Sequence, residues 1–222
     1  MGKYSFKNPK ARRSFILGIL ALVLIAVLAM GAVLLPRACG SSKATSPSGQ
    51  GTGDVGEQAY GVAIHTALVK KGLPGRPGKA RQVKYIVIHE TANTAAGADA
   101  KSHADFLCSG GEGTTSWHYT VDQDEIYHHI PDDEVAYHAS TAEGNQYGIG
   151  VELCVNSDGN FEKTFDNAAK LTAKLLRTHG LEISAVRQHA DFTDKNCPMT
   201  IRDSGRWQEF LNRVQSYLDQ PE

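Results

Sequence analysis

Two histidines and one cysteine are the side chains of this sequence best suited to bind a transition metal together. His189 and Cys197 lie eight positions apart in a segment that ends at Pro198. That spacing is too long for one helical turn, so we expect a loop that folds both side chains onto one ion. His89 directly follows the apolar run at residues 85–88 and is the expected third ligand. Zinc prefers imidazole and thiolate, and three protein ligands leave a fourth position open, as in catalytic sites. The pattern predicts a metal-dependent hydrolase.

Glu152 is the candidate general base. It stands between Val151 and Leu153, in a run that alternates with the period of two expected for a strand. If its face looks into a cleft beside the metal, partial desolvation would raise its pKa toward the range useful for proton transfer. The alternative is a glutamate on the solvated face of an edge strand, and spacing alone does not separate the two interpretations.

The histidines also have structural interpretations. Each predicted ligand could instead be a hydrogen-bonded core histidine or an inert cysteine, and only their joint pattern favours a metal. His118 is expected to be structural. His128 and His129 are neighbours that point to opposite faces of a strand, so they cannot both bind one ion. His138 lies in a predicted loop and could line the cleft.

The elements that would position these residues alternate between strands and helices. After an irregular stretch from residue 60, we expect strands at residues 83–89, 117–121, 125–130, 149–155 and 183–186. Helical spacing of apolar residues predicts helices from residue 97 to Gly110, at residues 163–179 and from residue 207 to residue 218, with Gly180 ending the second. The order implies an α/β fold, a mixed central β-sheet flanked by helices.

The first 58 residues are not expected to belong to that fold. Residues 15–35 are 21 uncharged, mostly apolar positions, enough for a helix of roughly 31 Å that crosses a bilayer. We therefore expect a basic cytoplasmic tail (residues 1–14), a transmembrane anchor (15–35), a flexible Gly/Ser/Thr-rich linker (36–58) and a folded domain (59–222). The five basic residues of the tail, with no acidic residue, predict that it stays in the cytoplasm.

This topology predicts a single-pass membrane protein with its folded domain on the extracellular side. A cleaved signal peptide, giving a secreted form, is the main alternative, but the apolar segment of such peptides is usually ~7–15 residues long. A lipid-modified Cys39 is a further alternative, although the preceding residues lack the apolar position expected of a lipoprotein cleavage site. We favour an uncleaved signal-anchor and a monomer.

Charge and cysteine content limit the other functions. Residues after 36 carry 18 Lys and Arg against 24 Asp and Glu, a net charge of −6. Nucleic-acid binding requires a basic surface, so we expect no nucleic-acid partner. Four cysteines in an exported protein could form two disulfides. With Cys197 assigned to the metal, we expect Cys108 and Cys154 to be buried free thiols.

Five motifs, in the right order over about residues 73–217, resemble the zinc-dependent N-acetylmuramoyl-L-alanine amidases, a family that includes phage endolysins and is related to peptidoglycan recognition proteins. The motifs are Ile86-Val87-Ile88-His89-Glu90-Thr91-Ala92, Trp117-His118-Tyr119, Ala136-Tyr137-His138-Ala139, Ile149-Gly150-Val151-Glu152 and Lys195-Asn196-Cys197-Pro198. The resemblance implies a mixed sheet with a zinc cleft along one side. It also implies a peptidoglycan or muropeptide substrate, cleaved between N-acetylmuramic acid and L-alanine.

Site residues follow from the resemblance position by position. It makes His89, His189 and Cys197 the ligands of Zn²⁺ and Glu152 the catalytic acid. Lys195 matches a lysine that stabilises the transition state, and His138 matches a substrate-binding histidine of a WHAG-like motif. Two positions depart from the family pattern: Tyr137 replaces the usual tryptophan of that motif, and Gly148 replaces an expected serine. Both bear on substrate detail, because neither belongs to the ligand set.

Two other classes of function compete with a cell-wall amidase. One is a non-catalytic module that binds peptidoglycan on the same scaffold; such proteins tend to lack the cysteine ligand, which is present here. The other is a disulfide-held adhesion domain in which Cys197 pairs with Cys154 or Cys108. A paired Cys197 could not bind zinc as a thiolate, so the state of this sulfur separates the adhesion domain from a zinc amidase.

Overall fold

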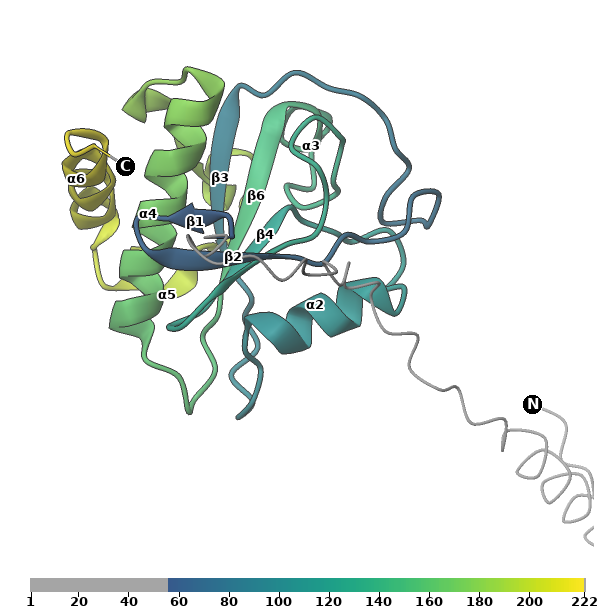
Figure 1. Cartoon of the computed structure of the whole chain (residues 1–222), viewed down its shortest axis with the longest axis horizontal. Helices are drawn as coiled ribbons and strands as arrows, with labels where there is room; N and C mark the ends of the chain where they lie inside the picture. Colours follow the sequence, from purple (N-terminus) through teal and green to yellow (C-terminus); the bar gives the residue numbers. More distant parts are fainter. Residues whose placement is uncertain (1–55, 222) are drawn as a thin grey trace, which may run out of the picture. The chain divides into compact units, whose positions relative to one another are not determined.

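The structure is a computed structural model that describes residues 56–221 (Figure 1). The predicted cytoplasmic tail, the transmembrane anchor and most of the linker lie outside these residues. Within residues 56–221, none of the helices combines the length and the apolar character needed to cross a membrane. The described residues include 59–221 of the predicted folded domain.

A mixed sheet of seven strands forms the centre of the described residues, in the order β1-β2-β5-β4-β6-β3-β7. The strands are β1 (Gln58–Ala59), β2 (Val62–Thr66), β3 (Tyr85–Glu90), β4 (Tyr119–Val121), β5 (Ile126–His128), β6 (Gly148–Leu153) and β7 (Val186–Gln188). β3 pairs in parallel with both β6 and β7, and β4 pairs in parallel with β6. β3 thus lies between two parallel neighbours near one edge of the sheet.

Helices cover both faces of this sheet. They are α2 (Ala100–Cys108), α3 (Ala142–Tyr147), α4 (Phe161–His179), α5 (Met199–Asp203) and α6 (Trp207–Leu218). In Figure 1, α4 and α6 lie together on one side of β3 and β6, whereas α2 and α3 lie on the other. Asn160 caps the start of α4, where its side chain accepts a hydrogen bond from the Lys163 amide, and Gly180 caps the end in the left-handed conformation (φ 61°).

The two faces of the sheet differ in chemistry because side chains alternate along a strand. Ile86 and Ile88 of β3, with Ile149 and Val151 of β6, are fully buried in one apolar core with residues of α4 and α6. The intervening positions point to the opposite face, where β3 carries His89 and β6 carries Gly148, Gly150 and Glu152. The larger apolar core thus lies on one side of the sheet, and the polar groups of the site are gathered on the other, where Val87 is also buried.

Most predicted elements are confirmed, including β3, the β4–β5 hairpin, α2, α4, β6 and α6. The irregular stretch expected from residue 60 is confirmed at residues 67–82 and wrong at residues 62–66, which form β2. Tyr60 and Gly61 both have positive φ and form a two-residue turn between β1 and β2, and such turns usually carry Asn or Gly at the first position. Val62 and Ile64 then face the core as a short strand.

The expected strand at residues 183–186 is also wrong in part. Residues Ile183–Ala185 form a 3-10 turn closed by a 2.8 Å hydrogen bond from the Ala185 amide to the Glu182 carbonyl, and β7 begins only at Val186. α3 and α5 were not predicted. Both are short, at six and five residues, which is too little sequence for a helical period to be evident.

The cysteines divide into two states. Cys154 and Cys197 are buried free thiols, which confirms the prediction for Cys154. Cys108 is disulfide-bonded, so the prediction of a free thiol there is wrong. Because Cys197 is free, the adhesion domain that required its pairing with Cys154 or Cys108 is contradicted.

Candidate active site

His89 reaches the polar face from the end of β3. It follows Ile88 in the strand alternation, so its ring points away from the apolar core and is nevertheless buried. Its neighbour across the sheet on one side is Glu152 of β6, which pairs with it in register. On the other side, Ile88 pairs with Gln188 at the end of β7, which brings the next residue, His189, beside His89. Parallel register therefore aligns His89 with both Glu152 and His189.

His189 opens a 3-10 turn (His189–Asp191) that immediately follows β7. The side chains of Gln188 and Asp191 each bond the other residue's backbone amide, a capping box that satisfies two amides at the start of this turn. Cys197 returns beside the turn, because its carbonyl accepts a 3.0 Å hydrogen bond from the Ala190 amide. The predicted loop that folds His189 and Cys197 together is confirmed as a conformation.

Glu90 attaches this loop to β3, a contact that the sequence did not predict. Its buried carboxylate accepts hydrogen bonds from the amides of Thr200 (2.9 Å) and Ile201 (3.1 Å), at the start of α5. Two neighbouring residues of β3 thus contribute to the site in different ways. His89 is a predicted metal ligand, and Glu90 anchors the segment just after Cys197. The partners are separated by 110 and 111 positions, and only the adjacency of His89 and Glu90 hints at them.

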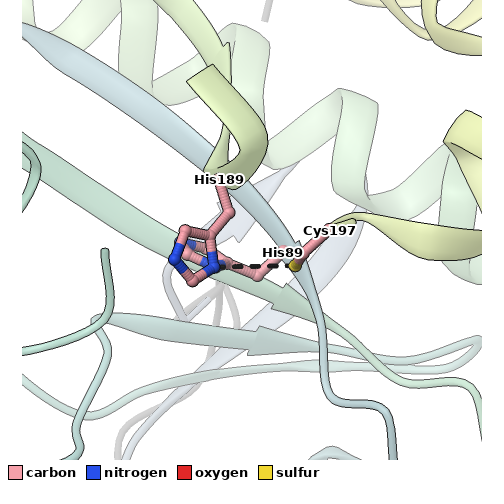
Figure 2. Close-up of side chains that lie close together, drawn as sticks. All are labelled: His89, His189 and Cys197. Atoms are coloured by element: carbon pink, nitrogen blue, oxygen red, sulfur yellow. Dashed lines mark hydrogen bonds between the residues drawn. The ribbon is translucent and has the colours of Figure 1, made fainter. Parts of the chain in front are cut away.

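The three predicted ligands converge, as Figure 2 shows, from β3, from the turn after β7 and from the following loop. His89 Nδ1 lies 3.1 Å from His189 Nδ1 and 3.9 Å from Cys197 Sγ. One donor atom from each residue lies within 4.8 Å of the other two. Ligands of a tetrahedral zinc ion lie roughly 3.3 Å apart for two nitrogens and roughly 3.6 Å apart for nitrogen and sulfur. The donor set therefore fits zinc in both chemistry and spacing.

Burial favours the neutral forms of these three side chains. Desolvation, with the positive charge of Lys195 contributing, lowers the pKa of His189, and it lowers the pKa of His89 well below the usual value. Desolvation also raises the pKa of the Cys197 thiol to about 12. Neutral imidazoles are in the form that binds a metal, whereas the thiol would have to lose its proton as the ion binds.

Glu152 lies next to this cluster, and only one of its two carboxylate oxygens is close to a partner. Its Oε1 is 3.9 Å from His89 Nδ1, and its Oε2 is buried without a hydrogen-bond partner among the described residues. Desolvation raises the pKa of Glu152 to about 7, although the charge of Lys195 opposes this shift. A carboxyl with such a pKa can both take and return a proton near neutral pH. The solvated edge-strand alternative is wrong, because β6 lies between β4 and β3.

Lys195 and His138 occupy contrasting positions. Lys195 is exposed on the loop before Cys197, yet its charge lowers the pKa of Glu152 and of both predicted histidine ligands. His138 is buried, with one ring nitrogen against His89 and the other against a backbone carbonyl. Its expected contact with substrate stays a prediction.

His118, His129 and His128 make hydrogen-bond contacts within the fold and are not part of the predicted ligand cluster. The His118 ring is fully buried and lies between the Gly150 amide and the Glu134 carbonyl. His129 Nε2 contacts the Thr120 hydroxyl at 2.8 Å, while the neighbouring His128 contacts the Ile130 carbonyl. Among the described residues, the only cluster of His, Cys, Asp or Glu suited to a metal is the predicted one.

Comparison with known proteins agrees with this geometry. The sequence profile of the N-acetylmuramoyl-L-alanine amidase family matches residues 79–200. The N-acetylmuramoyl-L-alanine amidase CwlH of Bacillus subtilis (strain 168) is 43% identical over 158 residues, which cover 70% of this chain and 62% of CwlH. The N-acetylmuramoyl-L-alanine amidase XlyA of the same organism is 43% identical over 151 residues, which cover 67% of this chain and 50% of XlyA.

Solved structures show the same fold. The catalytic domain of XlyA superposes with a TM-score of 0.65 at 40% identity, covering 69% of this chain and 99% of that domain. PlyL superposes with a TM-score of 0.64 at 27% identity, covering 70% of this chain and 99% of the PlyL chain. The match to the curated relatives extends over only about half to three fifths of their length. Because the family profile covers more than half of this chain, the resemblance carried by the five motifs is confirmed, and the chain belongs to the N-acetylmuramoyl-L-alanine amidase family.

Proposed function

We propose that this chain hydrolyses the amide bond between N-acetylmuramic acid and the L-alanine of the peptidoglycan stem peptide, using zinc held by His89, His189 and Cys197. The observation that carries the proposal is the convergence of two imidazole Nδ1 atoms and a thiol beside the unpartnered Glu152 Oε2. The names of the related proteins, N-acetylmuramoyl-L-alanine amidases, support the same bond.

The chain's own residues would divide the chemistry between them. Bound zinc supplies a Lewis acid that polarises the scissile carbonyl and makes water acidic enough to attack near neutral pH. Glu152 takes the proton of the attacking water and delivers it to the leaving amine, for which a pKa of about 7 is well matched. Lys195, exposed beside the site, offers positive charge to the developing oxyanion.

Digestion of purified peptidoglycan by the full chain tests this proposal. We expect release of stem peptides with new L-alanine amino termini, loss of activity with a chelator, and recovery when zinc is added back. Cys197→Ala should remove both zinc and activity. A chain that sediments with cell wall but releases no amino termini would contradict hydrolysis and favour the non-catalytic binding module.

We further propose that the domain acts outside the cytoplasm as a monomer, anchored by residues 15–35. The apolar length of this segment and its basic flank support the topology. The disulfide at Cys108 adds independent support, because structural disulfides persist in oxidising compartments.

Protease treatment of intact cells tests this localisation. An external protease should digest residues 59–222 while a tag at residue 1 stays protected, and the protein should fractionate with membranes. Recovery of the domain in the medium would favour the cleaved, secreted form instead. Light scattering of the detergent-solubilised chain measures whether it is monomeric.

A further inference from the structure

His138 makes a hydrogen bond to His89 that the proposed reaction does not use. The His89 Nε2 and His138 Nδ1 atoms are 2.9 Å apart, and His138 Nε2 lies 3.0 Å from the carbonyl oxygen of Gly148. Three groups thus form a line behind the predicted metal site: a β6 carbonyl, the His138 ring and the His89 ring. The far nitrogen of His89, Nδ1, is the atom that faces His189 and Cys197.

The direction of this line follows from the carbonyl at its end. A carbonyl oxygen can only accept a hydrogen bond, so His138 Nε2 carries the proton. A second proton on His138 would bury a positive charge, which is costly, so its Nδ1 is bare and accepts from His89 Nε2–H. In a neutral imidazole only one nitrogen is protonated, and His89 Nδ1 therefore presents a lone pair toward the other two ligands.

The backbone of β6 is shaped to hold the His138 ring in this position. A Cβ atom at Gly150 would lie 2.6 Å from His138 Cγ, and one at Gly148 would lie 3.3 Å from His138 Cε1. Both glycines lie on the polar face, two and four positions before Glu152, so their missing side chains leave the space that the ring fills. From α3, Asn145 Oδ1 accepts hydrogen bonds from the amides of His138 (2.9 Å) and Ala139 (2.7 Å).

We propose that His138 is a positioning residue, which fixes the tautomer and ring orientation of His89 so that Nδ1 is preset to bind the metal. Partners that hold the second nitrogen of a metal-binding histidine typically change metal affinity by 10–100-fold when they are removed. Here the backbone carbonyl does not contact the metal-binding histidine itself. The Gly148 carbonyl sets the tautomer of His138, and His138 in turn sets the tautomer of His89. This inference rests on the proposed zinc site.

Zinc affinity of the full chain, measured by competition with a chromogenic chelator, tests the proposal. His138→Leu removes the acceptor, and we expect zinc affinity to fall by roughly 10–100-fold. His138→Asn keeps an acceptor oxygen near the Nδ1 position and should recover most of that loss. Gly150→Ala keeps the His138 imidazole but displaces its ring, and it should lower zinc affinity as His138→Leu does.

The imidazole tautomer supplies a second readout that does not depend on zinc or activity. In the metal-free chain, ¹⁵N NMR should show His89 protonated at Nε2 in the wild type and a mixture of tautomers in His138→Leu. Unchanged zinc affinity and an unchanged His89 tautomer in His138→Leu, with unchanged affinity in Gly150→Ala, would overturn the inference. A wild-type chain that binds no zinc would instead overturn the proposed function, while the tautomer measurement would still report on the hydrogen bond.

Discussion

Glu152 is the residue at which structure and proposed chemistry meet most directly. Its Oε2 is buried without a partner, while Oε1 lies 3.9 Å from His89 Nδ1. A buried carboxyl with an unpaired oxygen lowers stability in most settings. At this position the unpaired oxygen is the atom available to receive a proton from water.

Replacement of Glu152 by Gln should separate catalysis from metal binding. Gln keeps the size of the side chain but cannot take a proton, so we expect kcat/KM on peptidoglycan to fall by roughly 10²–10⁴-fold. Zinc content, measured by atomic absorption, should stay at the wild-type level because Glu152 is not one of the three ligands. Full activity in this variant with zinc retained would remove the proposed base.

The same variant should also change how stability depends on pH. In the metal-free protein the pKa of Glu152 is about 7, against 4.5 as its ordinary value. As pH rises past 4.5 the unfolded chain loses this proton while the folded chain keeps it, so the free energy of unfolding falls until about pH 7 and is level above. Glu152→Gln should therefore gain stability relative to wild type at pH 8, by at most roughly 3 kcal/mol, and little at pH 4.

Urea unfolding of chelator-treated wild type and Glu152→Gln at both pH values measures this difference. The two proposed histidine ligands have lowered pKa values and give the opposite slope, but they are common to both proteins and cancel in the comparison. An equal stability difference at pH 4 and pH 8 would mean that the Glu152 carboxyl is not held protonated.

At the scale of elements, the contact between β3 and α5 holds the Cys197 loop in place. Glu90→Ala would remove the acceptor for the amides of Thr200 and Ile201 and leave both unpaired. We expect a loss of about 2–5 kcal/mol in the free energy of unfolding, because two charge-assisted hydrogen bonds are lost, together with weaker zinc binding. Glu90→Gln, which keeps one acceptor oxygen, should lose less of both.

Glu162→Ala is the matched control, because Glu162 also bonds across elements, to Arg206, but is exposed and does not contact the proposed ligands. It should cost no more than about 1 kcal/mol and leave zinc affinity unchanged. Equal zinc affinity in Glu90→Ala and wild type would show that α5 does not position Cys197.

Elements with a long or regular pattern were predictable from the sequence. β6 alternates over six residues and α4 repeats apolar positions over nineteen, with Asn160 and Gly180 at its ends. β1 and β2 were missed because a tyrosine occupies a turn position with positive φ. The donor set could be predicted because zinc restricts the ligand types, whereas the roles of Glu90 and His138 could not. Glu90 accepts from backbone amides and His138 contacts a backbone carbonyl, and backbone partners leave no mark in the sequence.

At the scale of the whole molecule, zinc should contribute to stability as well as to chemistry. The donors come from segments about 100 residues apart, and only the folded chain brings them together. Zinc at 100 times its dissociation constant should therefore raise the melting temperature by roughly 5–10 °C. Calorimetry of the chelated chain before and after zinc addition measures the shift. Cys197→Ala should show little shift, and a full shift in that variant would place the ion elsewhere.

The position of β3 between β6 and β7 also determines when the site can assemble during synthesis. His89 is synthesised long before residues 148–153 and 186–188, which form the two strands that flank β3. Until those strands emerge, the imidazole has no neighbour with which to share an ion. Capture of the proposed zinc ion would therefore follow the release of nearly all of the domain from the ribosome.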